Sequence, residues 1–166
     1  MKNLENYIIN NKKVLFRADF NVPLVDGKIS DDSRIIAVKE TIQKLIKQKN
    51  KVFIVSHFGR PNGKINKKYS LKFICPTLKK VLQLNKLYFL ETLNSEQIAN
   101  KINEVLYGEV CLLENIRFSP SEEEIDLNLT NFITKHFDVY VNDAFSASHR
   151  NHMSITGFPK YLPAVA

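Results

Sequence analysis

Four arginines of this sequence stand at or just beyond the ends of apolar runs, beside other polar residues. The chain has five arginines among its 24 basic residues. Each one is informative, because lysine serves solubility equally well and only arginine offers a planar fork for two oxygens. Arg17 alone lies inside an apolar run, and the other four are Arg34, Arg60, Arg117 and Arg150. These four and the nearby His57 would repel one another unless an anion bound among them, so the pattern predicts a site for carboxylate or phosphate oxygens.

Asp19 and Asn21 suit a second kind of ligand group. A carboxylate accepts hydrogen bonds and an amide both donates and accepts, so the pair could orient a hydroxyl-bearing carbon beside the arginines. Two alternatives stay open. The segment from Asn21 to Pro23, with the following Asp26-Gly27, also favours a turn, and each arginine could pair with a local carboxylate such as Asp32 or Glu114.

Continuous apolar runs predict the elements that would position these residues. Such runs are typical of strands covered on both faces, and they lie at 13–20, 51–57, 86–91, 110–115 and 138–144. Helical patterns separate them. We expect Ser33 or Asp32 to cap a helix running through Ile46, Ser70 to cap a second with Pro76 in its first turns, and 95–106 and 127–137 to form two more.

The alternating order predicts the fold. We expect a single α/β domain over residues 1–166, with three α/β/α layers and a parallel, Rossmann-like sheet of about five or six strands. In such sheets ligands bind beyond the carboxyl ends of the strands, where the arginines stand.

Competing motifs are weaker. The segment 59–64, GRPNGK, has three residues between its glycines instead of four, and no G-x-G-x-x-G is present, so nucleotide loops receive no support. His149 and His152 lack further ligands at zinc spacing, and we expect no metal site in this chain. The stretch 119–124, SPSEEE, is typical of a capped helix start with acids in its first turn.

Composition limits the class of protein. A hydrophobic fraction of 44% in 166 residues is enough for one core, and no apolar run approaches the roughly 20 residues of a membrane span. The two cysteines show no metal spacing and the start resembles no secretory signal, so we expect a soluble, cytoplasmic protein without membrane association. The net charge of +7 comes mainly from lysines spread among Asn and Ile. A nucleic-acid-binding domain is therefore an alternative that we do not favour, and a non-catalytic scaffold is a third possibility.

Several segments in order resemble the signatures of the phosphoglycerate kinase family. They are VLFRADFNVP (14–23), DDSRI (31–35), SHFGRP (56–61), YSL (69–71), LLENIRF (112–118), VNDAFSASHR (141–150) and LPAVA (162–166). The resemblance covers the whole chain and implies the amino-terminal, triose-acid-binding domain of a monomeric glycolytic enzyme.

The resemblance also implies roles for individual residues. The family binds 3-phosphoglycerate or 1,3-bisphosphoglycerate and transfers a phosphoryl group to ADP. Its substrate contacts fall here on Asp19, Phe20, Asn21, Arg34, His57, Phe58, Gly59, Arg60, Arg117 and Arg150. The counterpart of Arg34 is catalytic, since it steadies the transferring phosphoryl group.

The resemblance further implies a second domain, absent from this sequence, that binds Mg2+ with ADP or ATP. We therefore expect a fragment that binds 3-phosphoglycerate weakly and cannot transfer phosphate by itself. In members of the family, later parts of the chain cover apolar surface of this domain. That surface should be exposed here, which predicts reduced stability or self-association.

Overall fold

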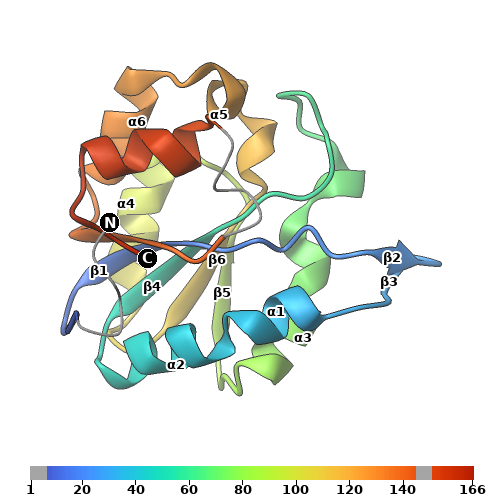
Figure 1. Cartoon of the computed structure of the whole chain (residues 1–166), viewed down its shortest axis with the longest axis horizontal. Helices are drawn as coiled ribbons and strands as arrows, with labels where there is room; N and C mark the ends of the chain where they lie inside the picture. Colours follow the sequence, from blue (N-terminus) through green and yellow to red (C-terminus); the bar gives the residue numbers. More distant parts are fainter. Residues whose placement is uncertain (1–6, 145–150) are drawn as a thin grey trace.

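A computed structural model describes residues 7–144 and 151–166, and its centre is a six-stranded parallel sheet (Figure 1). The strand order is β5-β6-β4-β1-β7-β8, and every neighbouring pair is parallel. The strands are β1 (Lys13–Arg17), β4 (Lys51–Val55), β5 (Leu87–Leu90), β6 (Val110–Leu113), β7 (Val139–Asn142) and β8 (Ala164–Val165). The predicted α/β fold with about five or six parallel strands is confirmed.

Helices cover both faces of this sheet (Figure 1). One layer holds α1 (Ser33–Ala37), α2 (Lys39–Lys47) and α3 (Cys75–Val81), with the 3-10 turns η2 (Lys67–Tyr69) and η3 (Leu71–Ile74) leading into α3. The other holds α4 (Ser95–Glu104), α5 (Ser121–Glu124) and α6 (Leu127–Thr134), together with a π-turn η6 (Met153–Gly157) and a 3-10 turn η7 (Phe158–Lys160). A further 3-10 turn, η4 (Ile116–Phe118), follows β6.

The strands are apolar on both faces because each face packs against helices. In β1, Val14 and Phe16 join a core that includes Ile42 of α2, whereas Leu15 joins a second core that includes Ile98 of α4. All five of these side chains are fully buried. Successive strand residues point to opposite faces, so the continuous apolar runs reflect two separate cores.

The strands are shorter than the sequence predicts. The first ends at Arg17 instead of Phe20, although the backbone N–H of Ala18 still donates to Val55 O at 3.0 Å. The three residues that leave the sheet are Ala18 and Phe20, which stay fully buried, and Asp19, whose side chain lies at the candidate ligand edge. The sixth strand, β8, is only two residues long and pairs with β7.

The turn signal after Asn21 is confirmed. A two-residue hairpin, β2 (Leu24–Val25) with β3 (Lys28–Ile29), projects from the sheet (Figure 1). Its turn residues Asp26 and Gly27 have φ values of 50° and 74°. Both residues tolerate this left-handed backbone, which two-residue hairpins require.

The helix expected from Ser33 through Ile46 is broken at Val38 into α1 and α2. Asp32 occupies the predicted N-cap position of α1 but makes no side-chain cap. Instead, Asp31 Oδ1 accepts the backbone N–H of Ser33 at 2.8 Å. An acceptor two residues before the donor forms a local turn, which here satisfies the first of the unpaired N–H groups at the start of the helix.

The cap expected at Ser70 is present but begins η3, where its Oγ accepts Lys72 N–H at 3.2 Å. Pro76 lies in the first turn of α3, as predicted. At 119–124 the predicted cap is absent, since no side chain caps α5. None of the helices in the described part of the chain combines the length and apolar character that a bilayer crossing requires.

Candidate functional site at the carboxyl edge of the sheet

The parallel strands bring most of the predicted residues to one edge. Asp19 and Asn21 follow β1, the segment 57–60 follows β4, and Arg117 follows β6. Arg34 lies in α1, which begins after the β2–β3 hairpin. Arg150 and His149 lie outside the described residues, so their predicted places stay predictions.

Asp19 joins the turn after β1 to α1. Its Oδ1 accepts the backbone N–H of Asn21 at 3.0 Å, and its Oδ2 forms an ion pair with the guanidinium of Arg34. The carboxylate side chain is 11% exposed and the Arg34 side chain 43% exposed. Asp19 is therefore a turn residue and the local carboxylate that pairs with Arg34, and its predicted contact with a ligand hydroxyl stays a prediction.

Asn21 connects β1 to the loop after β4. The backbone N–H of Gly59 donates to Asn21 Oδ1 at 2.9 Å. Gly59 has φ +60°, and a Cβ atom there would overlap the Tyr69 ring. Only glycine fits this backbone and this space, so the residue type at 59 sets how closely the loop approaches Asn21.

Arg117 supports the same loop from β6. It is 6% exposed, and its Nη1 donates to Gly59 O at 2.7 Å. Its backbone carbonyl accepts the N–H of Gly63 at 3.2 Å. Arg60, by contrast, is exposed on this loop. The two arginines therefore offer one positively charged group that is built into the site and one that is accessible from solvent.

Asn115 holds these segments together, and the sequence interpretation gave it no role. Its Nδ2 donates to Phe58 O at 2.7 Å and Tyr69 O at 2.9 Å. Its Oδ1 accepts the backbone N–H groups of Arg117 at 3.1 Å and Phe58 at 3.3 Å. The side chain is fully buried, and one amide thus satisfies the backbone polar groups of two loops.

His57 lies behind the edge, 4% exposed. Its Nδ1 lies 3.0 Å from Nη2 of Arg17, the arginine inside β1. Arg17 is 1% exposed, and its Nε donates to Ser154 Oγ at 2.9 Å. The sequence interpretation noticed that Arg17 stood apart from the other arginines, but assigned it no function.

Phe20 and Phe58 contribute differently from the other predicted site residues. Phe20 is fully buried in the core, and its backbone N–H donates to Ser56 Oγ at 2.8 Å. Phe58 is 8% exposed and packs against Phe73, with ring centroids 4.9 Å apart. The backbone groups of both residues are also used within the protein: Phe20 O accepts the N–H of Val22 at 2.8 Å, and Asn115 binds the N–H and the carbonyl of Phe58. Both residues thus support the loops, and their predicted contact with substrate stays a prediction.

The local-carboxylate alternative fails for Glu114. Its Oε1 accepts the backbone N–H groups of Leu71 at 2.8 Å and Asn115 at 2.7 Å, and its Oε2 accepts Ser70 Oγ–H at 2.6 Å. Both oxygens are thus used to join β6 to the start of η3, and Glu114 is 6% exposed. The carboxylate that pairs with an arginine at this edge is Asp19.

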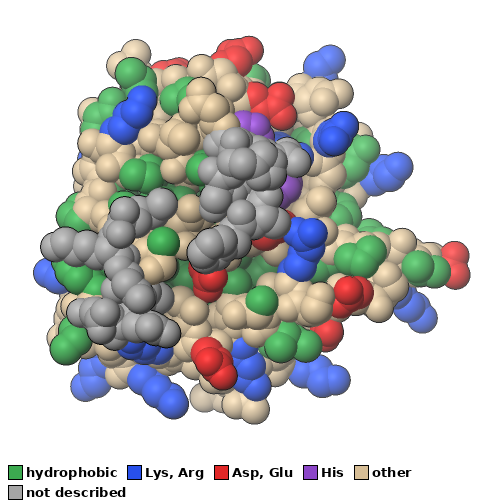
Figure 2. All heavy atoms as spheres, in the orientation of Figure 1, with side chains coloured by type: hydrophobic (Ala, Val, Ile, Leu, Met, Phe, Trp, Pro, Cys, Tyr) green, Lys and Arg blue, Asp and Glu red, His purple; other side chains and the backbone are tan. Residues whose placement is uncertain are grey.

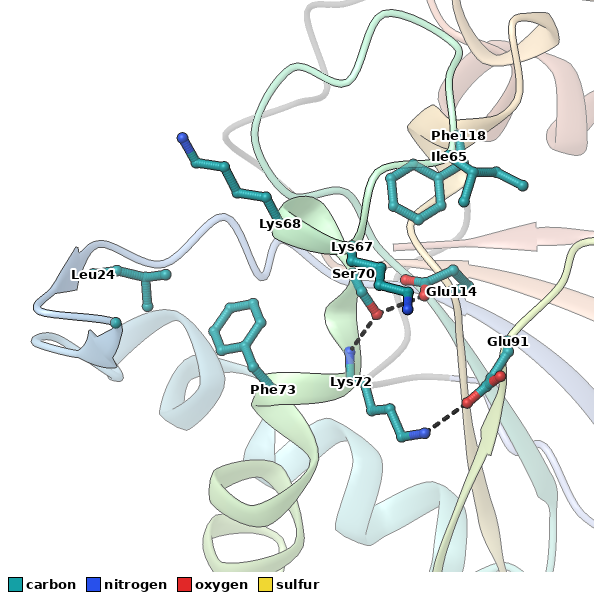
Figure 3. Close-up of a pocket in the computed structure, with 11 residues that line it drawn as sticks. Leu24, Ile65, Lys67, Lys68, Ser70, Lys72, Phe73, Glu91, Glu114 and Phe118 are labelled. Carbon is teal, nitrogen blue, oxygen red and sulfur yellow. Dashed lines mark hydrogen bonds and ion pairs between the residues drawn. The ribbon is translucent and has the colours of Figure 1, made fainter.

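A large cavity lies beside these residues, between the β2–β3 hairpin and the turns η2 and η3 (Figure 3). Its volume is about 870 Å³, and its lining includes Lys67, Lys68 and Phe73 but none of the predicted site residues. At its rim Lys72 Nζ pairs with Glu91 Oε1 at 2.6 Å. A smaller cavity of about 160 Å³ lies against Arg117.

Other classes of site receive little support. Within residues 7–144 and 151–166, no group of three or more His, Cys, Asp or Glu side chains is placed to hold a metal ion. On the face shown in Figure 2, Lys and Arg side chains lie at several separate places, and acidic side chains lie between some of them. A nucleic-acid groove would gather them in one stripe.

Comparison with known proteins gives one family. A model described as phosphoglycerate kinase matches residues 4–166. The phosphoglycerate kinase of Prochlorococcus marinus (strain MIT 9515) is 45% identical over 168 residues, which cover 100% of this chain and 42% of that protein. The phosphoglycerate kinase of Pseudothermotoga lettingae is 43% identical, covering 95% of this chain and 40% of that protein.

Solved structures agree. The phosphoglycerate kinase of Pyrococcus horikoshii OT3 superposes with a TM-score of 0.85 at 34% identity, covering 99% of this chain and 42% of that one. The phosphoglycerate kinase from Coxiella burnetii superposes with a TM-score of 0.84 at 35% identity, covering 98% of this chain and 40% of that one. This chain thus spans about two fifths of the length of the relatives it matches. By its sequence motifs, its fold and these matches, the chain belongs to the phosphoglycerate kinase family.

Proposed function

We propose that this chain, residues 1–166, is the triose-acid-binding domain of a phosphoglycerate kinase and binds 3-phosphoglycerate or 1,3-bisphosphoglycerate at the carboxyl edge of its sheet. One observation carries the proposal. Arg34 is paired with Asp19, and Arg117 is joined to Asn21 through Gly59, at one edge of the sheet with the buried His57 behind them. These residues come from four separate segments of the chain.

Each group has a role that follows from its chemistry. Arginine forks bind phosphate and carboxylate oxygens bidentately, so Arg60, Arg117 and Arg150 with His57 would hold the non-transferred phosphate. Asp19 and Asn21 would orient the hydroxyl of the triose acid. Arg34, held by Asp19 and 43% exposed, would steady the transferring phosphoryl group. The chain acts by positioning and by charge, as expected for phosphoryl transfer.

The nucleotide half of the reaction is proposed to lie outside this chain. A second domain would bind Mg2+ with ADP or ATP, and the metal would neutralise charge on the phosphate oxygens. A β-phosphate oxygen of ADP would attack the acyl phosphorus of 1,3-bisphosphoglycerate. The bond from phosphorus to the carboxyl oxygen breaks, leaving ATP and the carboxylate of 3-phosphoglycerate. We propose that the whole protein is a monomeric, cytoplasmic, glycolytic enzyme and that this chain alone is inactive.

Isothermal calorimetry tests the binding half. The chain should bind 3-phosphoglycerate, and Arg60→Ala, at an exposed arginine proposed to hold the phosphate of this ligand, should weaken binding about 10- to 100-fold because a charge-assisted bond is worth about 1.5–3 kcal/mol. Lys47→Ala is the matched control, since Lys47 is an exposed cation at the end of α2. Equal weakening by both variants, or a preference for an oligonucleotide that is lost steeply with salt, would contradict the proposal.

A coupled assay of ATP formation tests the other half. The chain supplied with 1,3-bisphosphoglycerate, ADP and Mg2+ should form no ATP above a blank without protein. Robust ADP-dependent turnover would show that the chain carries its own nucleotide site, and the division of roles proposed above would then be wrong.

A further inference from the structure

A buried row of polar side chains lies behind His57 and is not explained by the proposed ligand contacts. It runs from His57 through Arg17 and Ser154 to Glu122, so it joins β4 to β1, η6 and α5. Exposure is 1% for Arg17 and 0% for Ser154 and Glu122. Charged groups are costly to remove from water, and here two of them are placed in the core.

The hydrogen bonds within the row define its charges. Ser154 Oγ accepts from Arg17 Nε at 2.9 Å and donates to Glu122 Oε1 at 2.5 Å. The backbone N–H of Ser154 donates to Glu122 Oε2 at 2.9 Å. Both carboxylate oxygens therefore act as acceptors, and one serine hydroxyl links a buried anion to a buried cation. Glu122 also faces a second basic side chain, because Nδ1 of His152 lies 3.7 Å from Oε1 of this carboxylate.

Two further contacts hold the arginine in place. Its Nη1 donates to the backbone carbonyl of Ala18, the residue after β1. Ser154 is itself fixed, because Tyr140 donates its hydroxyl to Ser154 O at 2.5 Å. Burial raises the pKa of Tyr140 well above its usual range, so this hydroxyl keeps its proton. The guanidinium thus has a defined position from which Nη2 reaches His57.

The contact with His57 dictates where the imidazole carries its proton. A guanidinium has five N–H donors and no acceptor. Nη2 lies 3.0 Å from His57 Nδ1, so Nδ1 must present a lone pair. In a histidine with an unprotonated Nδ1, the ring is neutral and its one proton is on Nε2.

We propose that Arg17 is a positioning residue that fixes His57 in the neutral Nε2–H form, so that His57 offers an anionic ligand one directed hydrogen bond and no positive charge. Ser154 and Glu122 hold Arg17 for this purpose. The identity of the anion rests on the function proposed above, but the protonation of the ring does not. His57 then contributes direction to the site, and the arginines contribute its charge.

Nitrogen NMR of histidine tests the proposal without any ligand. In the complete gene product labelled with 15N-histidine, long-range proton–nitrogen spectra distinguish a protonated ring nitrogen from one with a lone pair. His57 is expected to show an unprotonated Nδ1 and a protonated Nε2 at neutral pH. A protonated Nδ1 in the wild-type protein would overturn the proposal at once, whatever the variants do.

Arg17→Met tests the cause. It keeps an unbranched apolar stem and removes the donor, so the Nδ1 signal of His57 should move toward a mixture of the two ring forms. His136 is an internal control, because it lies 2.8 Å from Ser95 on α4 and has no contact with this row; its signals should stay. An unchanged His57 in a folded Arg17→Met protein refutes the proposal. If that variant does not fold, Ser154→Ala removes only the bridging hydroxyl and should cause a smaller shift of the same sign.

Binding of 3-phosphoglycerate supplies the functional readout. Arg17→Met and His57→Phe should each weaken binding roughly tenfold, and the double variant should bind no more weakly than His57→Phe alone, because Arg17 acts through that ring. Independent, additive losses would contradict the proposal. Absence of any 3-phosphoglycerate binding would instead refute the proposed function and leave the nitrogen spectra to decide this inference.

Discussion

Replacing Asn115 with alanine removes the side chain that ties the end of β6 to the loop after β4. Four hydrogen bonds are lost, at 2.7, 2.9, 3.1 and 3.3 Å, and their backbone partners are left in a site where the amide is fully buried. A buried hydrogen bond contributes about 0.5–1.5 kcal/mol net. The longest of the four is weak, so we expect the free energy of unfolding to fall by about 3 kcal/mol.

Equilibrium unfolding in urea, followed by circular dichroism, measures this loss. Asn103→Ala is the matched control, because Asn103 is exposed on α4 and its replacement should change stability by less than about 0.5 kcal/mol. Asn115→Ala should also weaken 3-phosphoglycerate binding, since Arg117 and the loop at Gly59 lose their support. A loss below about 1 kcal/mol with an unchanged urea dependence would show that the amide is not the joint described here.

Three other variants or treatments have defined outcomes. Gly59→Ala should lower the free energy of unfolding in urea by about 2 kcal/mol or more. Gly27→Ala should lower it by only about 1 kcal/mol, because Gly27 is also left-handed but nothing lies within 4 Å of its added Cβ. Equal losses would mean that the Tyr69 ring moves aside. Arg60→Lys keeps the charge but loses the fork, so calorimetry should show roughly tenfold weaker 3-phosphoglycerate binding, and unchanged affinity would remove Arg60 from its role. Burial raises the pKa of Cys75 to about 11 and of Cys111 to about 12 from an ordinary 9.0. At pH 8 both thiols of the native protein should therefore react with a thiol reagent at least about 100-fold more slowly than those of the protein unfolded in guanidinium. Rapid reaction of the native protein would contradict their burial.

The strands could be predicted because their two faces pack into two cores, so that successive residues are apolar. The apolar runs around Val14, Phe53 and Leu112 show this pattern in the local sequence. Their ends could not be placed, because the residues that leave the sheet are still apolar or buried: Ala18 and Phe20 are both fully buried. A strand of two residues such as β8 is too short to show a pattern of apolar residues, and it is a strand only because it pairs with β7.

The site could be predicted where a residue type was unusual for its place. Arginines in a lysine-rich chain and polar groups at strand ends identified Arg34, Asp19 and Arg117. The buried row behind His57 could not be found in this way. Glu122 stands among two other glutamates and looks like a helix-start acid, and the serine that it holds lies 32 residues further along the chain. The burial of Glu122 depends on tertiary packing, which the local sequence pattern does not indicate.

The place of β1 in the middle of the sheet has a consequence for how the protein is made. This strand is synthesised before the other strands of the sheet, yet one of its neighbours is β7, far along the chain. The Lys13 N–H donates to the Asp138 carboxylate at 2.8 Å across 125 residues. Closing so long a loop is entropically costly and slows folding. On the ribosome β1 can pair with β4 early, but its other edge stays open until β7 has emerged. The contacts of Asp19 with Arg34 and of Asn21 with Gly59 need only the β1–β4 half of the sheet, so this part of the candidate site can form before the sheet is complete.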